Sequence, residues 1–444
     1  MNPNTRTFLT RFRGSVLLVT GALAAWHVSG AQSVLMAPPP SLIQPTSVQE
    51  DSTNNDMAVF LPAYDMTDSS LPQPLRFGPV TFRPHPYYHF LYDTGIKSGT
   101  NASQRSIVQE FSPGMTVDLG RHWTLDYTPT LRFYSNRAFR NSVDHSAILT
   151  GATRYEDWAF HLSQSFSQSD STLLETATQT KQQNYDTEFG GTRILSEKLS
   201  LDFGGSQVFN YVSGFQNSRT WSTMEWLNYE YNKRLIFGVG AGGGYVNIES
   251  DSALPGNPDQ SYEQMSARVH WRATDKLGFL LTGGFQEREI LASGYDNQLN
   301  PTFEATIEYA PFDHTTISLN GSRSVSPSDY VANAQSQATT SVTLQLCQRI
   351  LEDYSLTVGA GYTQNEYDQS QKVLLPSPPF PPGSTGVLGS IRTDDEYSFT
   401  MRLGRSFLKR GSVAVTYQYS DNISSLTGFS YRSNQIGFEI GFAY

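Results

Sequence analysis

The sequence predicts an all-β protein that crosses a membrane as an antiparallel, up-and-down β-barrel of about 18 strands. Three observations support this prediction. Apolar residues recur at every second position over most of the chain, and short polar turns alternate with longer polar connections. In addition, aromatic residues make up 13% of the chain and charged residues only 16%, whereas a soluble protein usually carries about 25% charged residues.

The N-terminus has the features of a secretory signal peptide, predicted over residues 1–31. Arg6, Arg11 and Arg13 precede a short apolar core at residues 16–25, and small residues at 29–31 suit cleavage after residue 31. No Cys lies near this point, so a lipid anchor there is not expected. The apolar core is too short to span a bilayer comfortably, and no later run reaches 18 apolar residues.

Residues 32–78 are predicted to form a flexible periplasmic tail. They are rich in Pro, Ser, Thr and Asp, and they show no sustained periodicity. A partner-binding role for this tail is the alternative interpretation. The barrel is then predicted to occupy residues 79–444.

From Val80 onward, apolar and polar residues alternate with a period of two, which is typical of strands that expose different faces to different surroundings. The apolar positions of the first runs are Phe82, Pro84, Pro86, Tyr88, Phe90 and Tyr92, then Phe111, Met115, Val117 and Leu119, then Trp123, Leu125, Tyr127, Leu131 and Phe133. These runs are long enough for tilted strands that span a membrane.

The connections between strands alternate in length. Short turns are predicted at Arg121-His122, Glu156-Asp157, Glu197-Lys198, Lys233-Arg234, Asp275-Lys276, Asp313-His314, Glu352-Asp353 and Lys409-Arg410. Longer connections are predicted at 94–105, 136–143, 169–184, 213–219, 250–261, 292–299, 324–338, 367–394 and 421–431. Eight turns and nine longer connections require 18 strands, which places both termini on the short-turn side.

The final strand is apolar at every second position and ends on an aromatic residue. Its apolar positions are Ile436, Phe438, Ile440, Phe442 and Tyr444. This pattern resembles the C-terminal assembly signal of bacterial outer-membrane proteins, although that signal more often ends in Phe. The resemblance implies the outer membrane as location, with outer-membrane lipid and the barrel-assembly machinery as partners.

Residues from about 80 to 444 resemble porin-like barrels of the outer membrane, including families of β-barrel porins defined by sequence alone. The resemblance rests on the strand pattern and not on a subfamily motif. It implies a channel for passive diffusion of small hydrophilic solutes, with export of a polysaccharide chain as a narrower version. The alternatives are a surface-interaction or structural barrel that displays extracellular loops and, less favoured, an outer-membrane enzyme.

Charge and cysteine content exclude several other classes. The net charge of −10 makes nucleic acid a poor partner, and the single Cys347 rules out an intramolecular disulfide. Cys347 is interpreted as an inert, inward-facing side chain. No cofactor, metal or enzymatic activity is predicted, and the oligomeric state is left open.

Three motifs that suggest chemistry have structural explanations. The glycines at 238–244 continue a strand pattern, whereas a phosphate-binding loop needs a helix after it. His85 and His89 would lie about 13 Å apart on a strand, too far apart to share one metal ion. Asp144 and Ser146 would point away from His145, so the run 144–146 cannot form a catalytic triad by itself.

Charged residues that alternate with apolar ones are predicted to face the lumen. An Arg on the lipid side near the midplane would cost about 2–4 kcal/mol. The predicted lumen-lining residues are Arg83, His85, His89, Glu110, Asp118, Asp126, Arg132, Arg154, Arg268, Arg272, Glu304, Glu308, Arg349, Arg402 and Glu439. They would form a polar channel, a set of ion pairs that brace the wall, or both, and their near balance of sign leaves the ion selectivity open.

The connection at 367–394 is the longest and contains a proline-rich stretch at 376–382. Proline stiffens the chain and removes backbone donors. The segment would constrict the pore, project as a recognition surface, or be a plain exposed loop.

Overall fold

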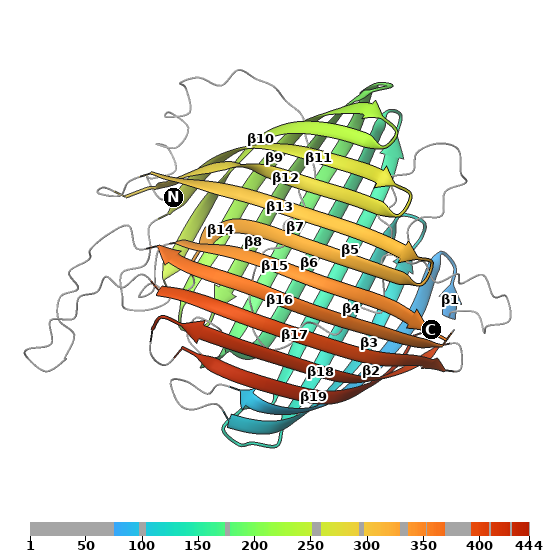
Figure 1. Cartoon of the computed structure of the whole chain (residues 1–444), viewed down its shortest axis with the longest axis vertical. Coiled ribbons are helices and arrows are strands. Elements are labelled where there is room, and N and C mark those ends of the chain that lie inside the picture. The colour runs from blue at the N-terminus through green and yellow to red at the C-terminus, as the bar shows by residue number, and fades with distance from the viewer. Residues whose placement is uncertain are drawn as a thin grey trace, which may run out of the picture.

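One antiparallel sheet that closes on itself accounts for all regular secondary structure in the described part of the chain (Figure 1). The computed structural model describes residues 75–96, 104–173, 178–250, 259–292, 297–328, 336–351, 353–368, 392–407, 410–426 and 429–443. The predicted signal peptide, residues 32–74 of the predicted tail, residues 369–391 of the longest connection and Tyr444 lie outside these ranges.

The sheet contains 18 long strands and one short strand, β1. The strands are β1 (Leu75–Phe77), β2 (Val80–Ile96), β3 (Gln104–Leu119), β4 (Trp123–Tyr134), β5 (Ser142–Tyr155), β6 (Trp158–Leu173), β7 (Thr178–Ser196), β8 (Leu199–Val212), β9 (Gln216–Asn232), β10 (Leu235–Ser250), β11 (Gln260–Thr274), β12 (Leu277–Ile290), β13 (Gln298–Phe312), β14 (Thr315–Pro327), β15 (Ser336–Ile350), β16 (Tyr354–Asp368), β17 (Arg392–Phe407), β18 (Gly411–Ser424) and β19 (Tyr431–Phe442).

Each long strand pairs with its neighbours in the chain, and β19 closes the barrel by pairing with β2. At this seam, residues 435–441 of β19 lie opposite residues 87–93 of β2. The predicted 18-stranded, up-and-down barrel is therefore confirmed. The short strand β1, at the end of the predicted tail, pairs with the first residues of β2.

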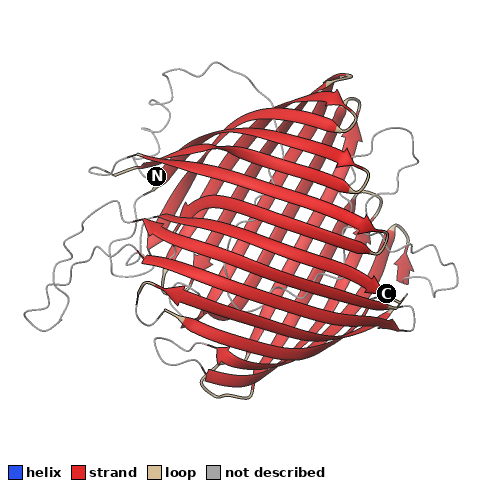
Figure 2. Cartoon of the chain, viewed as in Figure 1, coloured by secondary structure: helices blue, strands red, loops and turns tan. Residues whose placement is uncertain are grey.

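Figure 2 shows strands and connections in the described regions. Within those regions, no helix has the length and apolarity needed to cross a bilayer.

Six of the eight predicted short turns are fully described and fall between consecutive strands at the predicted positions; Glu352 and Lys409 of the other two lie outside the described residues. Several longer connections are shorter than predicted, because the strands extend further at that end. The predicted connection 169–184 is wrong over most of its length, since β6 reaches Leu173, β7 begins at Thr178 and Asp170 pairs with Lys181. Strands that extend beyond the lipid can consist of polar residues on both faces. The change from apolar to polar residues therefore did not show where these strands end.

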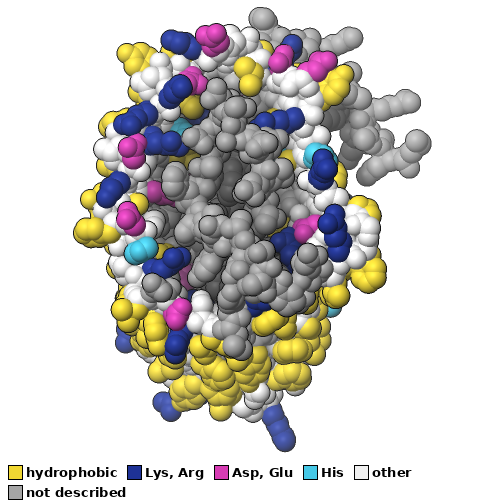
Figure 3. Space-filling view, turned by 90° about the vertical axis from the view of Figure 1, so that its right-hand side faces the viewer, with side chains coloured by type: hydrophobic (Ala, Val, Ile, Leu, Met, Phe, Trp, Pro, Cys, Tyr) yellow, Lys and Arg dark blue, Asp and Glu magenta, His cyan; other side chains and the backbone are white. Residues whose placement is uncertain are grey.

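The register assigns alternate residues to opposite faces of the wall. On β19, Ile436 and Phe438 are exposed on the outer face, whereas Gln435 and Glu439 are buried on the inner face. Figure 3 views the barrel from the short-turn end, where charged side chains lie around the rim and hydrophobic side chains gather on the flank. The outer face is therefore suited to lipid and the inner face to polar groups.

Aromatic side chains on the outer face lie toward both ends of the strands. Toward the short turns these are Trp123, Trp158, Tyr229, Trp271 and Tyr309, and toward the longer connections they are Tyr185, Trp221, Tyr245, Tyr362 and Tyr397. Such residues prefer the two membrane interfaces, so they mark the edges of the lipid-facing band.

Four glycines on the inner face of β10 make room for large side chains of the adjacent strands. A Cβ atom on Gly240 would lie 2.6 Å from the ring of Trp226, and one on Gly244 would lie 2.5 Å from the ring of Tyr262. Gly238 and Gly242 complete the row. The glycines at 238–244 therefore belong to a strand and serve packing.

Candidate functional site: the inner wall

All predicted lumen-lining residues lie on the inner face of the barrel, here called the inner wall. The register places them on the face opposite the exposed apolar residues. They are Arg83, His85, His89, Glu110, Asp118, Asp126, Arg132, Arg154, Arg268, Arg272, Glu304, Glu308, Arg349, Arg402 and Glu439. Their contribution to transport remains a prediction.

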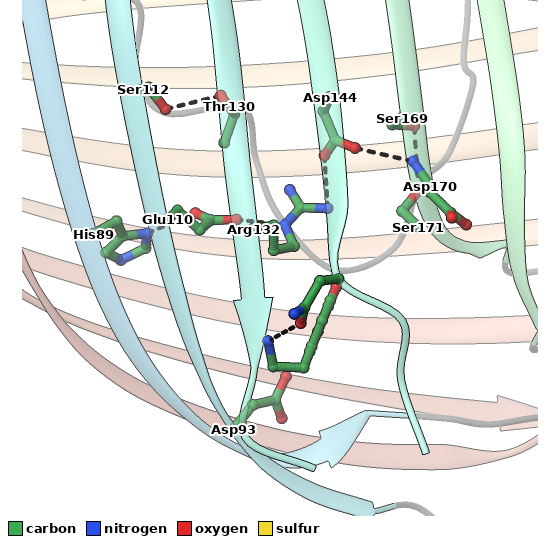
Figure 4. Close-up of polar contacts among 12 residues, drawn as sticks. His89, Asp93, Glu110, Ser112, Thr130, Arg132, Asp144, Ser169, Asp170 and Ser171 are labelled. Carbon is green, nitrogen blue, oxygen red and sulfur yellow. Dashed lines mark hydrogen bonds and ion pairs between the residues drawn. The ribbon is translucent and has the colours of Figure 1, made fainter. Parts of the chain in front are cut away.

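A chain of three charged side chains and one histidine crosses β2, β3, β4 and β5 (Figure 4). His89 Nδ1 lies 3.2 Å from a carboxylate oxygen of Glu110, whose other oxygen accepts a 2.6 Å hydrogen bond from Arg132 Nε. Arg132 Nη1 lies 2.8 Å from Asp144 Oδ2, and Asp144 also accepts the backbone N–H of Asp170. This chain links four strands, and Glu110, Arg132 and Asp144 alternate in sign within it; its members are largely shielded from solvent.

Further pairs extend the network on both sides. Arg83 lies 2.6 Å from Asp118, and His85 Nε2 lies 2.9 Å from Asp126. His85 and His89 therefore interact with different carboxylates. On the other side of the seam, Arg402 Nε donates a 2.8 Å hydrogen bond to Glu439.

A second cluster lies on β8, β9 and β11. Arg268 donates to Asp202 at 2.7 Å and to the side-chain oxygen of Asn228 at 2.6 Å. Its guanidinium carbon lies 4.6 Å from the centroid of the Trp226 ring. The glycines of β10 leave room for this cation–π contact, because a Cβ on Gly238 would lie 2.8 Å from Arg268 Cγ and one on Gly240 would lie 2.6 Å from the Trp226 ring.

A third cluster, near the long-connection end, was missed by sequence reasoning. Arg392 pairs with Asp394 at 2.5 Å, and its guanidinium lies 4.7 Å from the ring of Tyr367 and 4.0 Å from that of Phe429. Arg392, Asp394 and Tyr367 are fully buried. The predicted connection 367–394 contained both charged residues, but β17 begins at Arg392; Thr393 and Asp395 on the opposite face are also polar, so the apolar alternation was absent.

Arg288 on β12 was also missed. It donates to Gln260 at 2.6 Å and to the backbone oxygen of Val325 at 2.9 Å, and it stacks over Tyr262 at 5.1 Å. Arg288 is flanked by Glu287 and Glu289 on the outer face, so both faces of the strand are polar here. The sequence therefore shows no apolar alternation that would assign Arg288 to the inner face.

One part of the inner wall is open to solvent. Four consecutive inner-face positions of β15, from Thr343 to Arg349, are exposed; they include Gln345 and Cys347. Thr316 on β14, directly opposite Cys347, is also exposed, and so is Thr400 on β17, which lies on the far side of Gly359 in β16. This open strip lies in the half of the barrel nearer the short turns, whereas Arg288 and Arg392 are buried in the other half.

Some predicted inner-wall charges make no salt bridge. Glu304 and Glu308 on β13 have neither a hydrogen bond nor an ion pair from their side chains within the described ranges, and the same holds for Arg272 on β11. Their side chains therefore have no compensating partner among the described residues.

The run 144–146 is divided between the two faces, as predicted. Asp144 pairs with Arg132 on the inner wall, whereas His145 Nδ1 lies 2.9 Å from the hydroxyl of Tyr127 on the outer face. The four described apolar residues of the C-terminal pattern, from Ile436 to Phe442, lie on the outer face of β19. Whether they direct assembly remains a prediction.

Comparison with known proteins gives one family match, to a family described as "Putative beta-barrel porin 2", over residues 269–444. The match covers less than half of the chain and runs from the middle of β11 to the end of β19. No curated protein matches the sequence significantly.

Several solved structures are similar at low identity. OccK11 (OpdR) of Pseudomonas aeruginosa is 13% identical, with 82% of this chain and 95% of that chain covered at a TM-score of 0.40. A BenF-like porin of Pseudomonas fluorescens is 9% identical, with coverages of 82% and 99% and a TM-score of 0.43. The siderophore receptor PirA of Pseudomonas aeruginosa is 9% identical, with coverages of 81% and 80% and a TM-score of 0.40.

The assignment rests on the barrel's own closure, its two contrasting faces and the family match. Eighteen paired strands leave no free sheet edge, and the outer face is apolar between two aromatic belts. The chain is a closed β-barrel of the bacterial outer membrane, and its residues 269–444 match a family of putative β-barrel porins.

Proposed function

We propose that the barrel is a channel for passive diffusion of small hydrophilic solutes. The observation that carries the proposal is the open strip of the inner wall on β14, β15 and β17. Its exposed side chains, such as Thr343, Gln345 and Arg349, are polar groups that water and hydrophilic solutes can contact. Eighteen strands also enclose more space than inward side chains fill.

The charge distribution supports a modest preference for cations over anions. Most inner-wall arginines, including Arg83, Arg132 and Arg402, are neutralised by a carboxylate within salt-bridge distance. Glu304 and Glu308 lack such a partner, whereas Arg272 is the matching free cation among the predicted residues that the structure describes. A mobile cation therefore meets more uncompensated charge of opposite sign than a mobile anion does.

Planar-bilayer recordings with purified protein test this proposal. We expect discrete current steps that vary linearly with voltage, and a reversal potential in a salt gradient that indicates cation preference. Liposome swelling with sugars of increasing size would give the solute limit. A folded, inserted barrel that conducts no ions and admits no sugar would overturn the proposal and favour the surface-interaction alternative.

A further inference from the structure

Two arginines lie on the outer face of the barrel at the end nearer the short turns. Arg193 lies three residues before the end of β7, and Arg405 lies two residues before the end of β17. The register places both with the lipid-facing residues, and both are exposed. Among the described residues of the 18 long strands, no other Lys or Arg occupies the outer face in this half of the barrel.

Both arginines lie at the edge of the lipid-facing band. Arg193 is eight residues from Tyr185 on β7, and Arg405 is eight residues from Tyr397 on β17; the two tyrosines belong to the aromatic belt nearer the longer connections. Eight residues span about 26 Å along a strand, and an apolar band of about 25 Å is typical of such barrels. Because short turns face the periplasm in these barrels, both guanidinium groups lie at the headgroups of the periplasmic leaflet.

A rigid aromatic cluster holds the guanidinium group of Arg193. Trp158 on β6 is its direct cross-strand neighbour, and the guanidinium carbon lies 5.3 Å from the centroid of the indole ring. The indole is itself packed against Phe160 and Phe203, with centroid distances of 5.5 Å and 5.6 Å. The ring under the cation is therefore fixed by its neighbours.

Arg405 has the same arrangement at a second place on the wall. Its direct neighbour is Tyr354 on β16, and its guanidinium carbon lies 5.0 Å from the centroid of the tyrosine ring. Tyr354 is the first residue of β16, as Trp158 is of β6. Around the barrel, β17 is the tenth strand from β7 in one direction and the eighth in the other, so the two arginines lie on nearly opposite sides.

Neither guanidinium group has an acceptor within the protein. Arg193 and Arg405 form no side-chain hydrogen bond or ion pair with any residue that the structure describes. By contrast, three of the four described outer-face arginines nearer the longer connections have a carboxylate partner: Arg219 with Glu249, Arg323 with Glu366 and Arg432 with Asp421. Arginine has five N–H donors and is always charged, so Arg193 and Arg405 need an anionic acceptor from outside the chain.

We propose that Arg193 and Arg405 each bind the headgroup phosphate of an anionic phospholipid in the periplasmic leaflet. A guanidinium that lies over a ring keeps the N–H groups of its edge, which match two phosphate oxygens. An anionic headgroup neutralises the guanidinium, whereas a zwitterionic headgroup brings its own cation beside it. Toward the middle of the band, Phe189 on β7 and Leu403 on β17 are exposed on the outer face and suit the acyl chains.

Native mass spectrometry of the purified barrel in detergent tests the two sites. Dioleoylphosphatidylglycerol or dioleoylphosphatidylcholine is added in equal amounts, and the retained lipids are counted. We expect the wild-type barrel to retain up to two phosphatidylglycerol molecules and to bind phosphatidylcholine about fivefold more weakly. Arg193→Gln and Arg405→Gln should each retain one phosphatidylglycerol at most, and the double variant should retain no more of it than of phosphatidylcholine.

Arg219→Gln is the matched control, because Arg219 also lies over outer-face aromatic rings but already pairs with Glu249 at the other end of the barrel. It should retain phosphatidylglycerol like the wild type, and every variant should keep its heat-dependent gel shift. Inorganic phosphate in large excess should not displace the lipid, since a free anion lacks the acyl chains. Displacement by phosphate, equal retention of both lipids by the wild type, or unchanged phosphatidylglycerol retention by the double variant would each overturn the proposal.

Discussion

Replacing Arg132 with Met should destabilise the barrel strongly, because Arg132 neutralises two carboxylates at once. Its Nε lies 2.6 Å from Glu110 and its Nη1 lies 2.8 Å from Asp144. The three side chains are only 10%, 6% and 12% exposed, so water screens the charges weakly. Removing one partner of a buried pair costs about 3–5 kcal/mol, since the remaining charge stays buried without compensation.

The assay is urea-induced unfolding in detergent, followed by tryptophan fluorescence. We expect Arg132→Met to lose about 3–5 kcal/mol of unfolding free energy, whereas the triple variant Arg132→Met/Glu110→Gln/Asp144→Asn should recover most of it because no buried charge remains unpaired. Arg432→Met is the control: Arg432 pairs with Asp421 but is 67% exposed, so about 0–1 kcal/mol is expected. A loss below about 1 kcal/mol at Arg132, or a triple variant no more stable than the single one, would refute the reasoning.

Three other predictions address packing, selectivity and assembly. Gly240→Ala should cost about 1–3 kcal/mol in the same unfolding assay, because the new Cβ would overlap an indole ring, whereas Gly283→Ala, which has open space around it, should be nearly neutral. Glu304→Gln combined with Glu308→Gln should shift the reversal potential toward anions; an unchanged potential would remove these residues from the conduction path. Deleting residues 437–444 removes most of the β19–β2 pairing and leaves open strand edges in lipid, so the amount of folded protein in the outer membrane should collapse; normal levels would contradict a sealing role for β19.

The strand number and the side-chain faces could be predicted from the sequence because the two faces contact different media. Along β2, for example, Phe82, Tyr88 and Phe90 alternate with Arg83 and His89, and this period fixes the face of each residue. The short turns were equally clear, because each is a pair of polar residues between two such runs.

Prediction failed where both faces of a strand have the same polarity. The beginning of β17 is polar on both faces, so Arg392 and Asp394 were assigned to a connection. In the middle of β9 the polarity of the two faces is instead reversed, with apolar side chains inside and a charged side chain outside. Trp226 and Met224 are apolar but face inward, and this obscured the fact that Glu225 faces lipid.

The specific pairs on the inner wall could not be derived from the sequence. Arg132 meets Glu110 because β3 and β4 pair in one register, and it meets Asp144 because β5 follows in another. A shift of two residues in either register would keep every face and change every partner. The sequence pattern determines faces, whereas turn geometry and strand pairing determine contacts.

The most direct test of the central claim, that the inner wall lines a water-filled passage, uses the single cysteine. Cys347 is exposed on the inner face of β15, within the open strip. A membrane-impermeant, negatively charged thiol reagent added during single-channel recording should change the current of the wild-type protein in one irreversible step per barrel. Cys347→Ser should conduct normally and be insensitive to the reagent. A conducting wild-type barrel whose Cys347 is labelled without any change in current, or is not labelled at all, would contradict a passage along this strip.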